Sequence, residues 1–413
     1  MTTPIPAVPD DVWIQISDRM QVADLNALIS VDKDLHNRLR ENPRIWRGHL
    51  NSCTDTQLQA IARTVPVLEE PVDLLLKMRA MATLAGTGQE GFDGDGGRAD
   101  QSALHMPEEV AVAQDGTVYI ADTLNHRVRR VATDGVITTV AGTGQGSFGG
   151  DGGPARQAAL SGPRSVAVGP NGALYIADLG NRRVRCVAAD GTITTVAGTG
   201  QSGFGGDHGP AHEAVLCLPV GVAVGPDGTV YIADMGNHCV RRITGDNVIS
   251  TFAGTGRDGF GGDHGPSHQS LLRCPVGVAV GPDGTVYIAD RSNHRVRRIG
   301  VDGIITTVAG IGQKGFGGDG GPADRAVLSG PRSVAVGSNG TLYVADTFNH
   351  RVRCITPDGI VATLAGTGQN GFDGDGGPAP QALLSHPQGV AVGPDGLVHV
   401  VTGSRLRRFG APH

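Results

Sequence analysis

Short apolar stretches alternate with glycine-rich turns along most of the 413-residue chain, and from residue 81 onward they do so at a fixed interval. A glycine and a phenylalanine six residues after it both recur every 56 residues, at Gly86, Gly142, Gly198, Gly254, Gly310 and Gly366 and at Phe92, Phe148, Phe204, Phe260, Phe316 and Phe372. The first 80 residues lack this repeat. A fixed period of this size is typical of propellers and solenoids.

Each repeat unit contains four apolar segments of strand length. In the second unit they span residues 165–168, 174–178, 183–187 and 193–198, separated by turn residues such as Gly-Pro-Asn-Gly. Four short strands joined by tight turns predict an antiparallel sheet, and six such sheets predict a mainly β, six-bladed propeller. The first unit opens with only a fourth strand, at 81–86, and the last unit ends after its third strand. We therefore expect residues 81–86 to close the last blade of a propeller domain that spans residues 81–413.

The second and third strands of several units share a motif. The pattern Tyr-Ile-Ala-Asp-x-x-Asn-His-Arg-Val-Arg stands at 119–129 and 287–297, and at 231–241 with Cys239 in place of the first arginine. This motif resembles the NHL repeat, and the resemblance covers residues 81–410. It implies a six-bladed propeller but no single activity, because NHL propellers serve as protein-interaction platforms, RNA binders and, less often, enzymes.

Composition narrows the class of protein. The chain has 65 glycines and 24 prolines, yet 39% of it is hydrophobic, which excludes a helical bundle and argues against disorder. The net charge of −6 disfavours nucleic acid as a partner. The chain shows no signal-peptide pattern and no membrane-spanning stretch, and its six cysteines are scattered. We therefore expect free thiols, no membrane partner and a cytoplasmic location.

The polar residues of the motif are interpreted as structural. An aspartate ends the second strand in five units and an asparagine follows three residues later, at Asp122, Asp178, Asp234, Asp290 and Asp346 and at Asn125, Asn181, Asn237, Asn293 and Asn349. A catalytic group is expected once, whereas a residue repeated around a ring usually supports the fold. We expect Asx-type hydrogen bonds to amides of the turn between strands two and three.

A loop of about twenty residues joins each unit to the next. We expect Phe148 to plug this loop and Asp151 to cap a turn in it. The metal-binding alternatives are calcium at Asp93 and Asp95 or at Asp373 and Asp375, and zinc at Asp207, His208 and His212 or at Asp263, His264 and His268. No set supplies enough converging ligands, so we expect no cofactor.

The entry to the first strand is where the resemblance to enzymes of this fold can be checked. Amidating-lyase propellers place zinc-binding histidines there, and lactonase-type propellers hold an acidic calcium centre. Here the residues after the entry prolines are Glu108, Arg164, Val220, Val276, Arg332 and Gln388. They include no histidine, and only Glu108 and Glu109 are acidic. We therefore expect the chain not to be an enzyme.

The first 80 residues form a separate region, with a helical domain at 1–50 and a helical linker at 51–80. Apolar residues in 6–50 follow helical spacing, with Pro9 at a first-turn position. Val8-Pro9-x-Asp11-Val12, Ile16, Asp24-Leu25, Val31 and Ile45-Trp46 resemble the F-box in order. The resemblance implies that a Skp-type adaptor binds Pro9, Val12, Ile16, Leu25, Val31 and Trp46. The alternative is a helical cap that packs on the propeller.

The leading hypothesis combines both resemblances. An F-box followed by a propeller is expected to be the substrate receptor of a cullin-RING ubiquitin ligase, which holds an unknown protein target near the ligase. One alternative is an NHL scaffold or ligand-sensing protein unrelated to ubiquitin. A second is an RNA-binding propeller that would use Arg127, Arg183, Arg295 and Arg351, although these arginines lie close enough in sequence to the repeated aspartates to form internal ion pairs.

The target-binding face is expected where the repeat loses its symmetry. The loop between strands two and three and the long loop leave the strands at one end, so they share a face with the channel mouth. The non-repeating residues at that mouth are Glu108, Glu109, Arg164, Val220, Val276, Arg332 and Gln388. Arg164 and Arg332 stand three units apart, and two arginines on opposite sides are expected to clamp an acidic or phosphorylated segment. The alternative is that both pair with nearby carboxylates.

Overall fold

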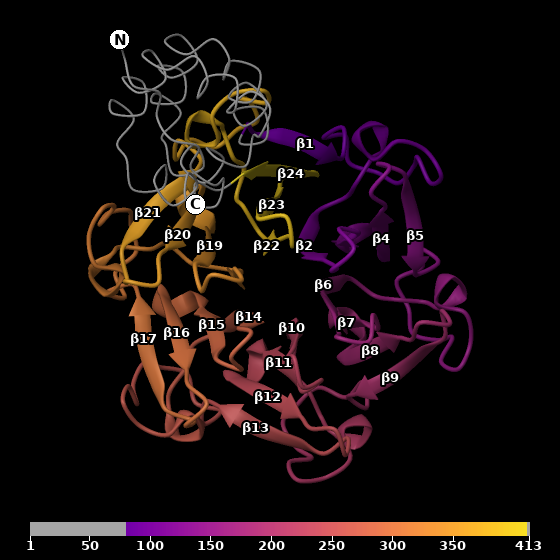
Figure 1. The fold of residues 1–413 in the computed structure, drawn as a ribbon. Coiled ribbons are helices and arrows are strands. Elements are labelled where there is room, and N and C mark those ends of the chain that lie inside the picture. Colours follow the sequence, from indigo (N-terminus) through magenta and orange to yellow (C-terminus); the bar gives the residue numbers. More distant parts are fainter. Residues whose placement is uncertain (1–79, 411–413) are drawn as a thin grey trace, which may run out of the picture. The chain divides into compact units, whose positions relative to one another are not determined.

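The computed structural model describes residues 80–410, which form six four-stranded antiparallel sheets around a common axis (Figure 1). In five sheets the strand that comes first in the chain lies nearest the axis, and the others follow outward in chain order. In the sixth sheet the outermost strand is instead the first strand of the described residues. The predicted mainly β, six-bladed propeller is confirmed. The F-box-like domain expected at 1–50 and residues 51–79 of the expected linker lie outside the described residues.

The six sheets are built from strands of three to six residues. They are formed by β2 (Pro107–Val112), β3 (Val118–Asp122), β4 (Arg127–Val131) and β5 (Ile137–Ala141); by β6 (Pro163–Val168), β7 (Leu174–Asp178), β8 (Arg183–Val187) and β9 (Ile193–Ala197); by β10 (Pro219–Val224), β11 (Val230–Asp234), β12 (Cys239–Ile243) and β13 (Ile249–Ala253); by β14 (Pro275–Val280), β15 (Val286–Asp290), β16 (Arg295–Ile299) and β17 (Ile305–Ala309); by β18 (Val334–Val336), β19 (Leu342–Asp346), β20 (Arg351–Ile355) and β21 (Val361–Ala365); and by β22 (Val390–Val392), β23 (Leu397–Thr402), β24 (Arg405–Gly410) and β1 (Ala82–Ala85).

Short 3₁₀ turns occur at two places in the repeat. One joins the second and third strands, as η3 (Thr123–Asn125), η5 (Leu179–Asn181), η7 (Met235–Asn237), η9 (Arg291–Asn293) and η11 (Thr347–Asn349). The other lies in the long loop, as η2 (Ala99–Gln101), η4 (Ala155–Gln157), η6 (Ala211–Glu213), η8 (Ser267–Gln269), η10 (Ala323–Arg325) and η12 (Ala379–Gln381). Within residues 80–410, no helix is long and apolar enough to span a bilayer.

The hydrophobic core is divided into layers between neighbouring blades. Val166, Ile176 and Ile193 of the second blade pack on Ala121 and Ala141 of the first, and similar layers recur around the ring. Large side chains on one blade thus meet small ones on the next, which lets the sheets stack closely. Because both faces of a blade are covered, its strands are more continuously apolar than those of a sheet with one face in water.

The two ends of the repeat array meet in the sixth blade. β1 pairs antiparallel with β24, with Ala82 opposite Arg408 and Thr83 opposite Arg407 (Figure 1). Thr83 also donates hydrogen bonds from its backbone N–H and its hydroxyl to Asp375, at 3.1 and 2.6 Å. The ring is therefore closed by the same ladder that joins strands within a blade.

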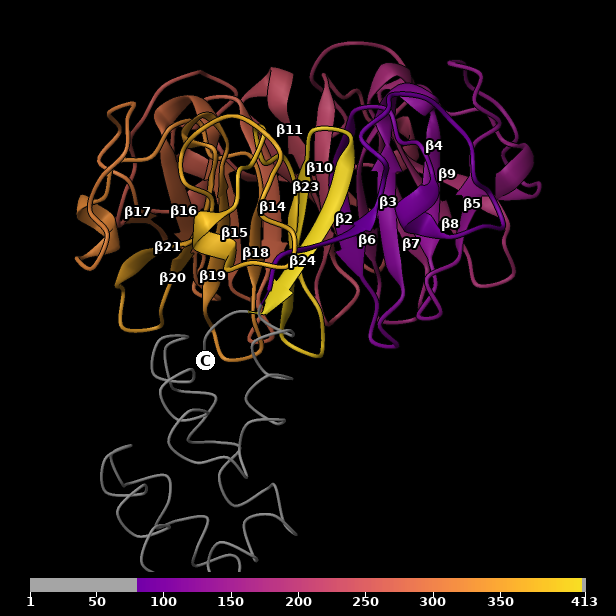
Figure 2. The ribbon, with the colours of Figure 1, turned by 90° about the horizontal axis from the view of Figure 1, so that it is seen from above.

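The long loops take a different path from the one expected. The strands run between the two faces of the propeller (Figure 2), and each long loop begins and ends at one face. Its middle, however, covers the outer strand of the next blade, because the N–H groups of Gly152 and Ala155 donate to the carbonyls of Ile193 (2.8 Å) and Gly191 (2.9 Å). Gly191 and Ile193 lie at the start of β9, at the face opposite the one where the long loop begins and ends. The loop therefore covers the outer edge of the blade, which would otherwise be open to pairing with another strand.

Candidate functional site: the channel mouth and the loop face

A buried arginine in the third strand attaches each long loop to its blade. The side chains of Arg129, Arg185, Arg241, Arg297, Arg353 and Arg407 are all inaccessible to solvent. In the second blade the Arg185 guanidinium lies 2.6 Å from Asp151 of the long loop and 3.5 Å from Asp178 at the end of β7. A guanidinium keeps its charge when buried, so it requires carboxylates beside it. This ion-pair triad was not anticipated from the sequence.

The aspartate that ends the second strand has partners other than those expected. Asp178 accepts hydrogen bonds from the Ser161 N–H (2.7 Å), seventeen residues earlier, and from the Asn181 side-chain amide (2.7 Å). Asn181 also donates to the Ser147 carbonyl (2.9 Å). The prediction of Asx bonds to turn amides was therefore wrong, because the pair instead holds the two ends of the long loop. Burial raises the pKa of Asp178 to about 6, while these bonds and Arg185 lower it.

Asp151 of the long loop is an ion-pair partner rather than the expected turn cap. Besides pairing with Arg185, Asp151 accepts a hydrogen bond from the Thr195 hydroxyl at 2.7 Å. Of the first calcium pair, Asp95 lies 2.8 Å from Arg129 and Asp93 accepts a bond from a backbone N–H.

The residues considered for zinc follow the same pattern. Asp207 pairs with Arg241 at 2.7 Å, and Asp263 pairs with Arg297 at 2.7 Å. Among the described residues, no three His, Cys, Asp or Glu side chains converge as metal ligands would. The carboxylates of these loops therefore have structural partners of their own.

The loop phenylalanines stack with arginines and do not plug the loops. Phe148 is 44% exposed, and the Arg183 guanidinium lies 3.8 Å from its ring centre. Arg183 also donates to the carbonyls of Asn181 (3.1 Å) and Thr199 (2.5 Å). The same arrangement holds Arg127, Arg295, Arg351 and Arg405. The arginines considered for RNA binding thus contact aromatic rings and backbone carbonyls. The ion pairs expected for them are made instead by the buried arginine two residues later in each blade, such as Arg185.

The histidine of the motif joins neighbouring blades. His126 has a φ of +53° at the end of η3, and its Nδ1 accepts a hydrogen bond from the Gly162 N–H at 3.0 Å. His294 makes the equivalent bond to Gly330. Burial lowers the pKa of His126, which favours the neutral ring that this bond requires.

The seven residues expected at the target-binding face do lie together, and we call them the channel mouth. A cavity of about 10 Å³ is lined by all seven, namely Glu108, Glu109, Arg164, Val220, Val276, Arg332 and Gln388. A space of this size holds about one water molecule. The mouth is therefore closed by its own side chains.

Ion pairs close the mouth. The Nε of Arg164 lies 2.5 Å from a Glu108 carboxylate oxygen, and the nearest nitrogen of Arg332 lies 3.9 Å from the same oxygen. Arg332 also donates to the Gln388 side-chain carbonyl. The two arginines thus converge on one carboxylate, so the expected clamp of two free arginines was wrong and the alternative of internal pairing was right. Burial lowers the pKa of Arg332 to about 10, which leaves it charged near neutral pH.

Glu109 lies one residue deeper than Glu108 along β2. At the equivalent position the other blades have Ser165, Gly221, Gly277, Ser333 and Gly389, so a long side chain occurs once at this level of the ring. Glu109 accepts hydrogen bonds from the Val110 N–H and the Ser333 hydroxyl, both at 3.2 Å. Burial raises its pKa to about 8. It separates the mouth from a chamber of about 230 Å³ lined by the first strands.

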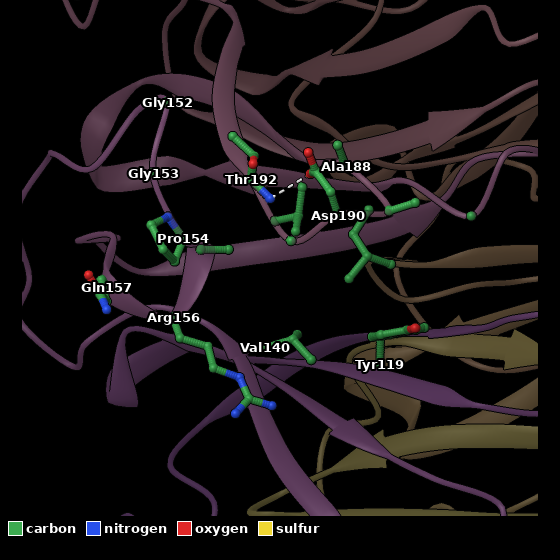
Figure 3. A pocket seen from close by; sticks show the side chains of 16 residues that line it. Tyr119, Val140, Gly152, Gly153, Pro154, Arg156, Gln157, Ala188, Asp190 and Thr192 are labelled. Carbon is green, nitrogen blue, oxygen red and sulfur yellow. Dashed lines mark hydrogen bonds between the residues drawn. The ribbon is translucent and has the colours of Figure 1, made fainter.

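A groove between the first and second blades was missed by sequence reasoning (Figure 3). It has a volume of about 550 Å³ and is lined by Tyr119 and Val140 of one blade and by Pro154, Asp190 and Thr192 of the next. It forms where the long loop crosses the outer edge of the second blade. Since every unit has similar residues there, no departure from the repeat marked it in the sequence.

Family profiles support the repeat assignment. The profile described as NHL repeat matches residues 216–243, 272–299 and 328–355. The profile described as Teneurin NHL domain matches residues 53–147 and 145–188. The propeller is therefore built from NHL repeats.

The chain spans only a minor part of the curated relatives that it matches. The chain is 30% identical over 286 residues to Protein SUPPRESSOR OF QUENCHING 1, chloroplastic, of Arabidopsis thaliana, covering 66% of this chain and 27% of that protein. It is 31% identical over 351 residues to Teneurin-3 of Danio rerio, covering 75% of this chain and 12% of that protein. A structural genomics protein of unknown function from Bacteroides thetaiotaomicron superposes with a TM-score of 0.60 at 18% identity, covering 80% of this chain and 76% of that one. The last likeness shows the fold alone.

Proposed function

We propose that the chain is a non-enzymatic interaction platform that binds its partner through the loop face, meaning the long loops and the turns between strands two and three. The observation that carries this proposal is the distribution of exposed large hydrophobic side chains. Among the described residues, Val301 alone lies in a turn of the opposite face. The others lie in connections of the loop face and are Phe92, Met106, Leu124, Phe148, Phe204, Leu218, Phe260, Ile311, Phe316, Phe348 and Phe372. Apolar groups gathered on one face commonly mark a contact surface.

The charged residues support binding rather than catalysis. The buried arginines and the loop aspartates neutralise one another, and Glu108 is paired with Arg164 in the channel mouth. Such groups stabilise the loops that present the apolar side chains. The channel mouth lies at the centre of this face, and we propose that its seven residues contact the partner without reacting with it.

Serine substitution of exposed apolar residues tests the platform. Leu124→Ser with Phe348→Ser removes two apolar side chains, 48% and 42% exposed, from different blades of the loop face. Partner capture should fall while the melting temperature stays within a few degrees of the wild type. Val301→Ser, at an 83% exposed position on the opposite face, is the matched control and should retain capture. Equal loss in both variants would place the interface elsewhere.

We further propose that the chain is an F-box-type receptor of a cullin-RING ubiquitin ligase in the cytoplasm. The support is the order of F-box-like residues in 1–50, where Pro9, Val12, Ile16, Leu25, Val31 and Trp46 would bind a Skp-type adaptor. A platform that binds a target at one domain and a ligase at another raises the local concentration of the target lysines.

Co-purification with a Skp-type adaptor tests the receptor proposal. Pro9→Ala combined with Trp46→Ala should abolish adaptor binding, whereas Leu124→Ser with Phe348→Ser should leave it intact. Unchanged adaptor binding in the first variant would refute the F-box assignment and leave the platform proposal standing.

A further inference from the structure

One blade departs from the arginine–phenylalanine stack. In five blades a guanidinium lies 3.5 to 3.8 Å from the ring centre of a loop phenylalanine. In the third blade the arginine that begins the third strand is replaced by Cys239, a short and fully buried side chain. Phe204 keeps only the contact with the deeper Arg241, whose guanidinium is 4.8 Å from its ring centre.

The space that the missing guanidinium would fill is open. A methyl group built on Gly144, Gly200, Gly312 or Gly368 would collide with the stacked guanidinium of its blade. At the equivalent Gly256 the nearest atom is the Asn237 carbonyl oxygen, 3.9 Å away. Phe204 is also 53% exposed, whereas the other five loop phenylalanines are 40–45% exposed. The shorter cysteine side chain therefore leaves room above the ring.

Two carbonyl groups border this space. In other blades the guanidinium donates to the carbonyl of the motif asparagine at 3.1–3.2 Å and to a carbonyl of the following loop at 2.5–2.7 Å. The corresponding acceptors here are the carbonyls of Asn237 and Thr255, and among residues 80–410 no side chain donates to either. The two carbonyl groups that hold a guanidinium in other blades are therefore present in the third blade, but the guanidinium is not.

The local charge also favours a cation. In the first blade two guanidiniums, of Arg127 and Arg129, stand near two carboxylates, of Asp95 and Asp122. The third blade keeps both carboxylates, Asp207 and Asp234, but only one guanidinium, that of Arg241. The surroundings of the open space therefore carry one positive charge fewer than the same region of the first blade.

We propose that the third blade binds a guanidinium group supplied from outside the chain. The group would stack on Phe204, as an arginine does on the loop phenylalanine in five other blades. It would donate to the carbonyls of Asn237 and Thr255, as the arginine does to the equivalent carbonyls in four of those blades. The ligand is a free guanidino compound or an arginine side chain of a partner, because both carry the same planar fork of donors. An alkylammonium binds less well, since it cannot donate to both carbonyls while lying flat on the ring.

Arg257 is the competitor within the chain. It stands beside Gly256, where the other five units have glutamine, and its side chain is exposed. Arg257→Gln restores the usual residue and removes a guanidinium that lies close enough in sequence to enter the site. This variant separates an external ligand from an internal one.

Calorimetric titration of the full chain with methylguanidinium, below denaturing concentrations, tests the proposal. Wild type, Cys239→Ala and Arg257→Gln should bind it saturably, with butylammonium at least about tenfold weaker. Cys239→Arg, which supplies the guanidinium, should weaken binding at least about tenfold and raise the melting temperature. Equal binding by the Cys239→Ala and Cys239→Arg variants would overturn the site. Binding by the Arg257→Gln variant but not by the wild type would show that Arg257 fills the site, and would overturn the proposal of an external ligand.

Peptides distinguish the two sources of the ligand. A short peptide with one arginine that binds more tightly than methylguanidinium, and that loses this advantage when lysine replaces the arginine, would assign the site to a partner protein. Equal affinity of the peptide and methylguanidinium would assign it to free guanidino compounds. Binding of the lysine peptide as tightly as the arginine peptide would contradict the proposal.

Discussion

At the residue scale, the buried arginines dominate the energetics of the loop face. A buried cation is tolerated only because two carboxylates and several carbonyls surround it, as around Arg185. The other five buried arginines also pair with an aspartate of the long loop, so each blade has a polar core beside its apolar layers. The NHL motif therefore encodes an ion-pair network as much as a strand.

Removing one of these arginines should destabilise the propeller strongly. Arg185→Met leaves Asp178 and Asp151 without their cation, which we expect to cost about 3–5 kcal/mol of unfolding free energy. Urea denaturation measures this difference. The exposed Arg156, replaced by Met in the same blade, is the control and should change stability by less than about 0.5 kcal/mol. Similar midpoints for the two variants would refute the structural role of Arg185.

His399 makes stability depend on pH. It stands where five blades have tyrosine, is 3% exposed, and has no hydrogen-bond partner for Nδ1 among the described residues. Burial lowers its pKa to about 4, so the unfolded chain gains a proton first as the pH falls below about 6.5. Above about pH 6.5 the histidine is neutral in both states and its protonation does not affect stability. Between this pH and pH 4 only the unfolded chain gains the proton, which lowers the free energy of unfolding by about 2–3 kcal/mol at pH 4.5.

Comparison with His399→Tyr isolates this contribution, because the carboxylates titrate in both proteins. The stability difference in favour of the tyrosine variant should grow between pH 7 and pH 4.5, as measured by denaturant unfolding at each pH. A difference that stays constant would show that His399 is not buried as a neutral ring.

At the element scale, close approach of the first strands sets the width of the channel. A methyl group on Gly277 of β14 would lie 2.6 Å from the Arg332 carbonyl oxygen at the entry to β18. Small residues at this level let neighbouring strands touch, while Glu109 of β2 fills the space that they leave. The closed mouth thus follows from how near the six strands lie to one another.

Gly277→Ala should therefore separate two blades at the axis. Overpacking against backbone atoms is expected to cost about 1–3 kcal/mol. Gly205→Ala, at a loop position where an added methyl meets no atom within 4 Å, should be neutral or slightly stabilising. Thermal unfolding of the two variants gives the comparison, and equal melting temperatures would contradict the packing seen at β14.

At the scale of the whole molecule, the clasp between β1 and β24 closes the ring. A chain that begins at Met81 keeps β1, whereas one that begins at Thr87 exposes the edge of β24. We expect the shorter chain to melt at lower temperature and to aggregate, because unpaired strand edges bind one another. Calorimetry and light scattering measure both effects. Indistinguishable behaviour of the two chains would refute the clasp.

The sequence by itself determined the number of blades, the strand positions and the residues that gather at the channel mouth. These features follow from a 56-residue period and from local alternation of apolar and turn residues, and both can be read directly from the sequence. The sequence also shows where the motif histidine recurs and where Glu109 breaks the repeat. It does not show which hydrogen bonds these side chains make.

Only the tertiary structure decided how the polar residues are paired. Asp151 and Thr195 are 44 residues apart, and Arg164 and Glu108 belong to different blades. A repeat offers six copies of each donor and acceptor, so sequence distance does not select the partner. The selection is made by strand register, by the path of the loop over the outer edge, and by the free-energy cost of leaving a buried charge unpaired. That cost is why the mouth arginines close on Glu108 instead of remaining free.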